Sequence, residues 1–379
     1  MLTKCYFKVP MNATKNSPIY SNLLKPQKIA ENITDFPIKD LTRVDSIFTN
    51  LFPSHFFDRY IAGNENLKEL RVISRHKLAL ASSGIGYVEP DVQALLTQTQ
   101  QYTKAENYLF CQNKITLTCL TKVNKILAAE NKKAGKIRTT QTWIGAKKIE
   151  NAIYVCPPPN EINKLLETLV AFINNDNIPI EARIIIGHAH LLDIHPFYDG
   201  NGRTARALMG ALLKKHFVLY INPSLFRLHS KTTTVFANEY INAIHSFHKN
   251  NIPITQYHSF WYESFQWAIE TQVKINELVQ QVKNKIKSKI LLVNLSPEGL
   301  ILIDYLWQQP VICEQGLNKK FGWSKQTIQQ QIMALLQLQL IEPKKLRAIK
   351  NAIVFSCPII LDTWNKMDDI LFEAVDHAN

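Results

Sequence analysis

One stretch of twelve residues, His195 to Arg206, constrains the fold and the chemistry of this chain more than any other. It is His-Pro-Phe-Tyr-Asp-Gly-Asn-Gly-Arg-Thr-Ala-Arg, so an imidazole, a carboxylate and two guanidiniums surround a glycine-rich turn. Because Pro196 disfavours helical geometry at the residue before it, we expect the apolar run Ile180–Ile194 to form a helix that ends there. Gly200 and Gly202 permit a tight turn and the close approach of a ligand. The pattern therefore predicts a helix, a loop and a second helix in succession.

The second helix begins in this turn and gives the turn its expected chemistry. The first N–H groups of a helix have no partner within it, and together with the positive end of the helix dipole they attract anions. Arg203 and Arg206 project from neighbouring positions on the first turn, so we expect phosphate groups to bind here. Asp199 would repel phosphate unless a divalent cation lies between them. His195 is then suited to take a proton from an attacking hydroxyl.

The same residues also have a simpler interpretation. Asp-Gly and Asn-Gly are ordinary turn signals, and on that view His195 is a loop residue and the arginines form a solvated helix face. For either dipeptide alone, the simple turn is the better interpretation. The complete string favours a phosphate site, because it places a base, a carboxylate and two cations together.

The string resembles, position for position, the signature His-x-Phe-x-(Asp/Glu)-Gly-Asn-Gly-Arg-x-x-Arg of the Fic family. The resemblance implies an all-α Fic fold and transfer of a nucleotide monophosphate, usually AMP from ATP, to a Ser, Thr or Tyr hydroxyl of a target protein. His195 would be the base, Asp199 the Mg²⁺ ligand and Phe197 a buried anchor. The implied nucleotide contacts are Gly200, Asn201 at the α-phosphate, Gly202, Arg203 and Arg206 at the distal phosphates, and Tyr240 near the adenine. For Tyr240, packing between helices is an equal alternative.

A short β-prone region precedes the apolar run. The segments Thr139–Gly145 and Ala152–Cys156 alternate, are rich in β-branched residues and are followed by three prolines, which predicts a hairpin. Exposed hairpin edges pair with extended peptides, and the family resemblance implies a flap that aligns the target by main-chain hydrogen bonds. Ile153, Tyr154 and Val155 are the candidates for that role. The alternative is a hairpin that only covers the core.

An inhibitory element common in relatives is degenerate here. In many of them, Ser-x-x-x-Glu-Gly or Ser-x-x-x-Glu-Asn supplies a glutamate that pairs with the second motif arginine and blocks placement of the ATP γ-phosphate. The matching place here begins at Ser82, and Gly86 takes the position of the glutamate. We therefore expect Arg206 to be free for phosphate. Glu89 lies one helical turn further on, roughly 5 Å away, and a glycine-rich turn between helices is the alternative interpretation.

Composition limits the class of protein. A net charge of +13 favours polyanionic partners such as ATP, nucleic acid or an acidic protein surface. The six cysteines contain no Cys-x-x-Cys pair, so neither a zinc site nor a disulfide framework is indicated. Neither a signal peptide nor an apolar run of about 18 residues is visible. These features predict a soluble cytoplasmic protein that does not enter a membrane, although a secreted effector would have the same sequence features.

We divide the chain into an N-terminal helical region (1–112), a Fic catalytic core (113–282) with its small β-hairpin flap, and a C-terminal winged helix-turn-helix (290–379). In the last of these, Ser296-Pro-Glu opens one helix and Ser324 is a plausible N-cap of another. The resemblance to a winged helix implies DNA binding, with dimerisation or protein interaction as alternatives. The candidate base-reading residues are Lys325, Thr327, Gln329, Gln330 and Gln331, and the candidate phosphate contacts are Lys344, Lys345 and Arg347.

Two functions remain open at this point. The first is a protein adenylyltransferase, with ATP, Mg²⁺ and a target hydroxyl as reactants. The second is a DNA-binding regulator whose Fic pocket senses nucleotide or modifies itself. An enzyme that also removes AMP from its target is a variant of the first function. Because a purely sensory pocket needs no base, the intact His195 favours the transferase.

Overall fold

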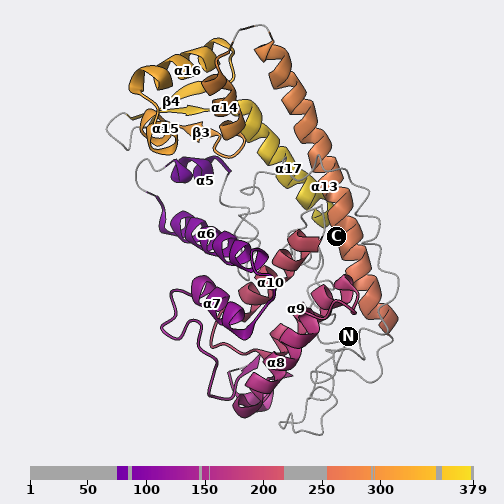
Figure 1. Cartoon of the computed structure of the whole chain (residues 1–379). Coiled ribbons are helices and arrows are strands. Elements are labelled where there is room, and N and C mark those ends of the chain that lie inside the picture. The colour runs from indigo at the N-terminus through magenta and orange to yellow at the C-terminus, as the bar shows by residue number, and fades with distance from the viewer. Residues whose placement is uncertain are drawn as a thin grey trace. The chain divides into compact units, whose positions relative to one another are not determined.

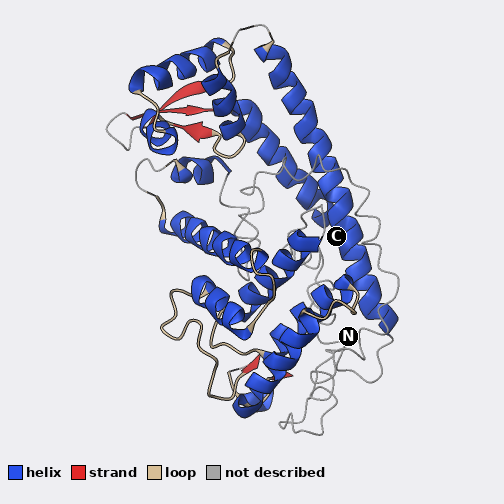
Figure 2. Cartoon of the chain, in the orientation of Figure 1, coloured by secondary structure: helices blue, strands red, loops and turns tan. Residues whose placement is uncertain are grey.

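The computed structural model describes residues 75–83, 88–144, 147–152, 154–216, 254–291, 293, 295–346 and 352–376 (Figure 1). These residues are mostly helical, with two small antiparallel sheets (Figure 2). They fall into two compact units, which we call the first unit (101–268) and the second unit (75–100 with 269–376). Tyr240, Ile153 and Gly86 lie outside the described residues, as do the first 74 residues.

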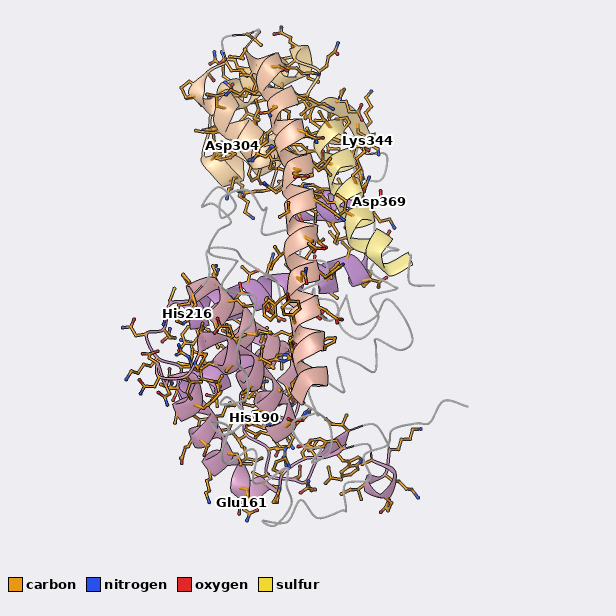
Figure 3. The ribbon with its side chains drawn as sticks, turned by 90° about the vertical axis from the view of Figure 1, so that its right-hand side faces the viewer. Glu161, His190, His216, Asp304, Lys344 and Asp369 are labelled. Carbon is orange, nitrogen blue, oxygen red and sulfur yellow. The ribbon has the colours of Figure 1, made fainter. Side chains whose placement is uncertain are left out.

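The first unit is built around helix α9 (Ile180–Ile194). Of its 15 residues, 12 are buried, which fits a helix that is apolar nearly all round. It packs against α8 (Ile162–Ile173) and α10 (Asn201–His216), and α10 also packs against α7 (Leu117–Leu127). His188 and His190 are buried in this core, and Figure 3 shows His190 among the packed side chains.

Helix boundaries in the first unit follow local chemistry. Helix α9 ends at Ile194, as Pro196 predicts, and α10 begins at Asn201, within the glycine-rich turn as expected. Two separate helices precede the hairpin, since α6 (Pro90–Phe110) ends and α7 begins after Thr116. The Thr116 hydroxyl caps α7 by accepting a hydrogen bond from the Cys119 amide at 3.2 Å.

Basic side chains satisfy the carbonyl groups that helix C-termini leave without partners. Arg183, which is buried, donates to the Ile173 carbonyl at the end of α8 (3.3 Å) and to the Asp176 carboxylate (2.8 Å). Lys215 donates to the carbonyls of Gln112 and Asn113, just beyond α6, at 3.1 Å each. Cations at these positions also complement the negative ends of the helix dipoles.

The second unit combines helices with a three-stranded antiparallel sheet of order β3-β5-β4. Ser296 and Ser324 cap α14 and α16 as expected, and Gly322 ends α15 in the left-handed conformation, with φ 69°. Strand β3 and helix α17 were not expected from the sequence. The elements, in chain order, are α14 (Pro297–Leu306), β3 (Val311–Ile312), α15 (Glu314–Phe321), α16 (Lys325–Gln337), β4 (Glu342–Leu346), β5 (Ala352–Ser356) and α17 (Pro358–Asp376).

Helix α5 (Arg75–Ser82) is also part of the second unit. Its Ala79 packs into a small core with Val311, Cys313 and Val354. The Gln309 side-chain amide donates to the carbonyls of Ala79 and Val311 and so ties α5 to β3. The helix that precedes the segment of Gly86 therefore packs with the C-terminal sheet.

Helices α6 and α13 (Ile254–Ile290) contribute residues to both units. Four lysines, Lys283, Lys285, Lys287 and Lys289, lie in the last turns of α13. Among the described helices, none combines the length and hydrophobicity that crossing a bilayer requires.

Candidate active site

His195 has a left-handed backbone conformation, with φ 47° and ψ 58°, at the C-cap of α9. Its amide donates to the Leu191 carbonyl at 3.2 Å, which closes the last turn of the helix. A left-handed conformation costs a non-glycine residue about 1–2 kcal/mol. The contacts around His195 must therefore maintain this conformation, and they fix the direction in which its imidazole leaves the loop.

The imidazole of His195 is neutral at physiological pH. Burial lowers its pKa to about 4, the nearby Leu192 carbonyl opposes this shift, and the positive charge of Arg138 adds to it. The Nδ1 atom is buried and makes no hydrogen bond of ordinary geometry with any described residue. A neutral imidazole can accept a proton, which is the first requirement for a general base.

The turn after His195 is held against α7. Gly200 has φ 75°, and a Cβ atom there would lie 3.1 Å from both the Ala128 Cβ and the Asn124 Nδ2. Both the conformation and the space therefore require glycine. The Asp199 carboxylate accepts a hydrogen bond from the Gly200 amide at 2.6 Å, which folds the side chain over the start of α10.

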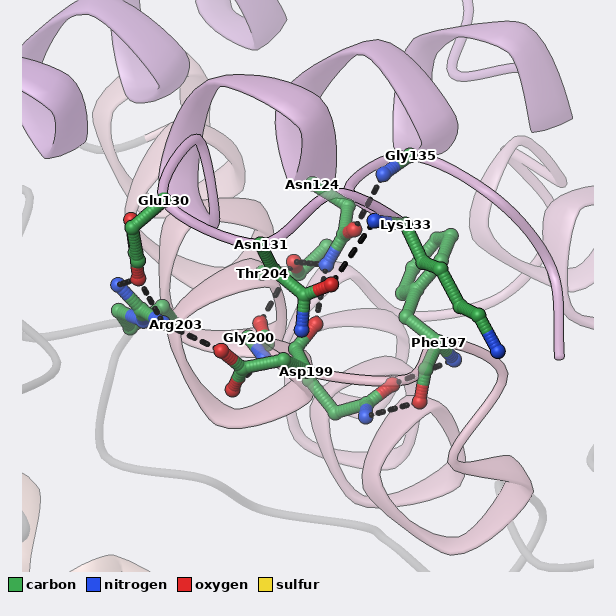
Figure 4. A network of polar contacts seen from close by, with 11 residues as sticks. Asn124, Glu130, Asn131, Lys133, Gly135, Phe197, Asp199, Gly200, Arg203 and Thr204 are labelled. Carbon is green, nitrogen blue, oxygen red and sulfur yellow. Dashed lines mark hydrogen bonds and ion pairs between the residues drawn. The ribbon is translucent and has the colours of Figure 1, made fainter.

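Asn124 connects the motif turn and the start of α10 to the backbone at Gly135 (Figure 4). From α7, its side-chain amide donates to the Asp199 carbonyl at 2.8 Å and to the Thr204 hydroxyl at 3.2 Å, while its oxygen accepts from the Gly135 amide at 2.8 Å. The Thr204 hydroxyl in turn donates to the Gly200 carbonyl at 2.8 Å. Asn124 is buried, so these bonds are strongly constraining.

Asn201 closes the loop from the other side. Its oxygen accepts a hydrogen bond from the Phe197 amide, and its nitrogen donates to the Phe197 carbonyl, both at 2.9 Å. The Phe197 side chain is fully buried, as expected for an anchor. Asn201 thus fixes the loop that carries His195, and its contact with an α-phosphate remains a prediction.

The two motif arginines have different surroundings. Arg203 donates through both terminal nitrogens to Glu130 at 3.0 Å and through one of them to Asp199 at 3.4 Å. Arg206 is buried, and its Nη1 lies 3.3 Å from where a Cβ atom on Gly202 would be. Within the described ranges, Arg206 has no carboxylate partner. Because α10 begins at Asn201, Arg203 lies in its first turn as expected, whereas Arg206 lies in its second turn.

The expected hairpin forms between β1 (Trp143–Ile144) and β2 (Tyr154–Val155), with Trp143 opposite Val155. The side chains of Tyr154 and Val155 are buried, and the Tyr154 hydroxyl donates to the Asp193 carbonyl at 2.8 Å. Because these side chains face the core, they can contact a target only through their main chain. That is the mode of recognition the family resemblance implies.

The remaining candidate residues with described positions lie in the second unit. The Ser82 hydroxyl donates to the Leu78 carbonyl within α5, at 2.9 Å. Glu89 pairs with Lys77 at 3.1 Å, and both side chains are about half exposed. Glu89 is therefore already engaged with a cation of its own unit.

Three residues of this site were missed by the sequence analysis: Asn124, Glu130 and Arg138. Asn124 had a usable signal, because it is a polar residue on the apolar face of α7, beside Leu120 and Val123. Glu130 and Arg138 have no comparable pattern in the sequence. They are recognised only by the residues that they contact.

Comparison with known proteins agrees with this geometry. Residues 114–213 match the Fic/DOC family model. A protein adenylyltransferase of Caenorhabditis briggsae is 36% identical over 91 residues, 23% of this chain and 16% of the relative. A probable protein adenylyltransferase of Aquifex aeolicus is 38% identical over 66 residues, 17% of this chain and 21% of the relative. The matched segments thus span about a fifth or less of each relative.

Among solved structures, a Fic family protein from Desulfovibrio desulfuricans is 15% identical and covers 91% of this chain and 97% of its own, with a TM-score of 0.46. That likeness is too weak to bear on the site. The family match instead rests on residues 114–213, which include α9, the first 13 residues of α10 and the loop between the two helices. The chain therefore contains a domain of the Fic/DOC family.

Proposed function

We propose that this protein is an adenylyltransferase that transfers AMP from ATP to a hydroxyl of a target protein. One observation carries the proposal: a single loop joins a buried, neutral imidazole to a carboxylate and to a helix N-terminus with two arginines. The names of the relatives support the same activity in the matched segment. The intact base favours transfer over a pocket that only senses nucleotide.

In this mechanism, ATP lies over the first turn of α10, with its distal phosphates at Arg203 and Arg206. His195 removes the proton from the target hydroxyl as the hydroxyl oxygen attacks the α-phosphorus. A bond forms between that oxygen and phosphorus, the bond to the bridging oxygen of the β-phosphate breaks, and pyrophosphate leaves. Arginines and helix amides aimed at the leaving group should supply much of the rate by stabilising its charge.

Asp199 is the residue that would hold Mg²⁺. Its carboxylate is about half exposed at the mouth of the turn, and carboxylate and phosphate oxygens are the ligands that this cation prefers. Bound there, Mg²⁺ would neutralise phosphate charge. The described residues contain no cluster of three or more metal-binding side chains. The nucleotide would therefore have to supply Mg²⁺ ligands in addition to the Asp199 carboxylate.

Two substitutions test the roles. His195→Ala should abolish AMP transfer and leave ATP binding largely unchanged, because the phosphates bind at the other end of the loop. Asp199→Ala should lose both turnover and the dependence on Mg²⁺. His216→Ala, at the end of α10, is the matched control and should keep full transfer. Transfer by His195→Ala at a rate near that of wild type would contradict the assignment of the base.

For the C-terminal part of the chain, we propose a winged helix-turn-helix that binds DNA. The order of helices and strands from α14 to β5, with a tight turn between α15 and α16, supports this fold. Lys325, Gln329 and Gln330 are exposed on α16, and Lys344 and Lys345 are exposed on β4. Gln331 cannot read bases, because it is buried and accepts a hydrogen bond from Ser296 at 3.0 Å.

A gel shift with the full chain tests this second proposal. Replacing Lys344 and Lys345 with alanine should weaken binding to all sequences and lower the salt dependence by about two counterions. Lys366→Ala, on α17, removes an exposed lysine that is paired with Asp362 and is the control. Unchanged affinity in the double variant would assign any DNA binding to another basic surface. AMP transfer should be the same in all three proteins.

A further inference from the structure

Arg138 is a fully buried arginine whose described hydrogen-bond acceptors are all backbone carbonyls. Its side chain is 1% exposed. Its Nε donates to the His195 carbonyl at 2.7 Å, and its Nη1 donates to the Thr140 carbonyl at 3.0 Å. Its Nη2 donates to the carbonyls of Pro157 (2.6 Å) and Ile194 (3.2 Å). One guanidinium thus holds four carbonyls from three separate parts of the chain.

These carbonyls belong to the two parts of the site that must cooperate. Ile194 and His195 are the end of α9 and the proposed base. Thr140 and Pro157 flank the two strands of the flap, one before β1 and one after β2. Arg138 therefore ties both ends of the hairpin to the backbone of His195.

The main chain around Arg138 extends this tie. The Arg138 amide donates to the Pro196 carbonyl at 2.9 Å, and Ile137 forms an isolated antiparallel bridge with Phe197. The Thr139 amide donates to the Tyr198 hydroxyl at 3.0 Å. Residues 137–139 thus run alongside the first residues of the motif before they enter the flap.

Burying the charge of Arg138 costs free energy, and a residue with only a packing role would not require a charge. Burial lowers the pKa of Arg138, yet an arginine stays protonated, so a charge is held inside the protein with carbonyl dipoles as its partners. A planar group with five donors can hold several acceptors in fixed directions, which lysine cannot do. His195 also needs such support, because its left-handed conformation is unfavourable on its own.

We infer that Arg138 is a positioning residue that sets the flap and the proposed base in one register. A target segment aligned on the flap would then present its hydroxyl at a fixed height above His195. This inference rests on the proposed AMP transfer to a protein segment. It concerns how the hydroxyl is placed, whereas the proposed phosphate contacts lie at the start of α10, at Arg203 and Arg206.

The variant Arg138→Lys tests this role, because it keeps the charge and removes the planar set of donors. We expect kcat for AMP transfer to fall about tenfold to a hundredfold, since a displacement of about 1 Å can cost that much. The KM for ATP should change less than twofold. The matched control is Arg183→Lys, which also replaces a buried arginine that bonds a carbonyl in the first unit. It should lower the midpoint of thermal unfolding and leave kcat unchanged.

Comparing these two variants separates an effect on the placement of the hydroxyl from a general loss of stability. A kcat for Arg138→Lys equal to that of wild type overturns the inference, and so does an equal loss of kcat in Arg183→Lys. Wild-type protein that transfers no AMP, in an assay where a known adenylyltransferase works, contradicts the proposed function instead. In that case, or if Arg138→Lys does not fold, a measurement on the wild-type protein decides.

That measurement is native-state hydrogen exchange of three amides. At the base of the flap, the Arg138 amide donates to the Pro196 carbonyl and the Cys156 amide donates to the Thr142 carbonyl. Within the loop, the Phe197 amide donates to the Asn201 side chain. If Arg138 ties flap and loop together, all three should exchange through one opening, with protection within about threefold of each other. Cys156 exchanging a hundredfold faster than Phe197 would show that the flap moves independently of the base, and would overturn the inference.

Discussion

Glu130 accepts a hydrogen bond from each terminal nitrogen of Arg203, both at 3.0 Å. The Glu130 side chain is 57% exposed, whereas that of Arg203 is 10% exposed. An ion pair with one exposed partner is worth about 0–1 kcal/mol, so an incoming phosphate can replace it. Glu130 therefore occupies the guanidinium that the proposed mechanism assigns to the distal phosphates.

Replacing Glu130 with glutamine should lower the KM for ATP. The substitution removes a negative charge beside the phosphates and frees Arg203, and the loss of up to about 1 kcal/mol of competing interaction corresponds to a two- to fivefold change. Steady-state kinetics with ATP as the varied substrate measures this. Glu167→Gln, an exposed residue of α8, makes the same charge change elsewhere and should have no effect. A higher KM for Glu130→Gln would show that Glu130 helps to hold ATP.

Asn124→Ala should destabilise the first unit and reduce transfer. The change removes the Asn124 partner of the Asp199 carbonyl and of the Gly135 amide, whereas the Thr204 hydroxyl keeps its bond to the Gly200 carbonyl, and such losses cost about 1–3 kcal/mol. Urea unfolding measures the free-energy difference. Asn131→Ala is the control, because that side chain accepts only an exposed bond from the Lys133 amide. Equal stability of the two variants would mean that the hydrogen bonds of Asn124 shown in Figure 4 contribute little.

The glycine at position 86, where the family resemblance implies an inhibitory glutamate in many relatives, predicts a protein that is active without a stimulus. Gly86 offers no carboxylate to Arg206, so purified wild-type protein should modify itself or a target at once. Gly86→Glu should reduce transfer by about tenfold to a hundredfold, because a charge-assisted pair with arginine contributes roughly 1.5–3 kcal/mol. Gly84→Glu adds the same charge two residues away and is the control. Labelled ATP measures the incorporation of AMP.

The alternative inhibitor, Glu89, gives a distinct outcome. Its carboxylate pairs with Lys77 in the second unit, so Glu89→Ala should transfer AMP at the wild-type rate. A silent wild type that becomes active in Glu89→Ala would show that Glu89 inhibits after all. A silent wild type unaffected by that change would leave a second subunit as the source of inhibition.

Features that depend on neighbouring residues could be predicted from the sequence. Pro196 ends α9 through a clash with the residue before it, and Ser296 and Ser324 cap their helices through bonds to amides three residues on. The hairpin and the motif loop are local for the same reason. Each of these depends on steric and hydrogen-bonding preferences that act within a few residues.

Features that depend on distant contacts could not be predicted. The Asn124 and Arg138 side chains reach residues 75 and 57 positions away, and Gln309 bonds Ala79 across 230 positions. Nothing in the pattern around Arg138 distinguishes it from a surface arginine. Likewise, the docking of α5 on β3 follows from a shared apolar core, which no periodicity within α5 specifies.

The buried histidines should make the first unit less stable in mild acid. Burial, followed by the charge of Arg206, lowers the pKa of His188 to about 3, whereas Asp193 acts in the opposite direction. Between these two pKa values, the histidine is protonated in the unfolded chain, where its pKa is near 6.5, and neutral in the folded chain. Stability from His188 is therefore complete above pH 6.5 and is lost as the pH falls toward the folded value.

Urea unfolding at pH 7 and pH 5 tests this in wild type and in His188→Gln. Because one pKa unit corresponds to 1.36 kcal/mol, His188 alone should remove about 2 kcal/mol of stability between these pH values, and the variant should lose that much less. His195, with a pKa lowered to about 4, adds a loss of the same sign in both proteins. His216→Gln is the control, since that residue is exposed. An equal loss in wild type and His188→Gln would mean that His188 is protonated in the folded protein, with Asp193 as the nearby charge able to stabilise it.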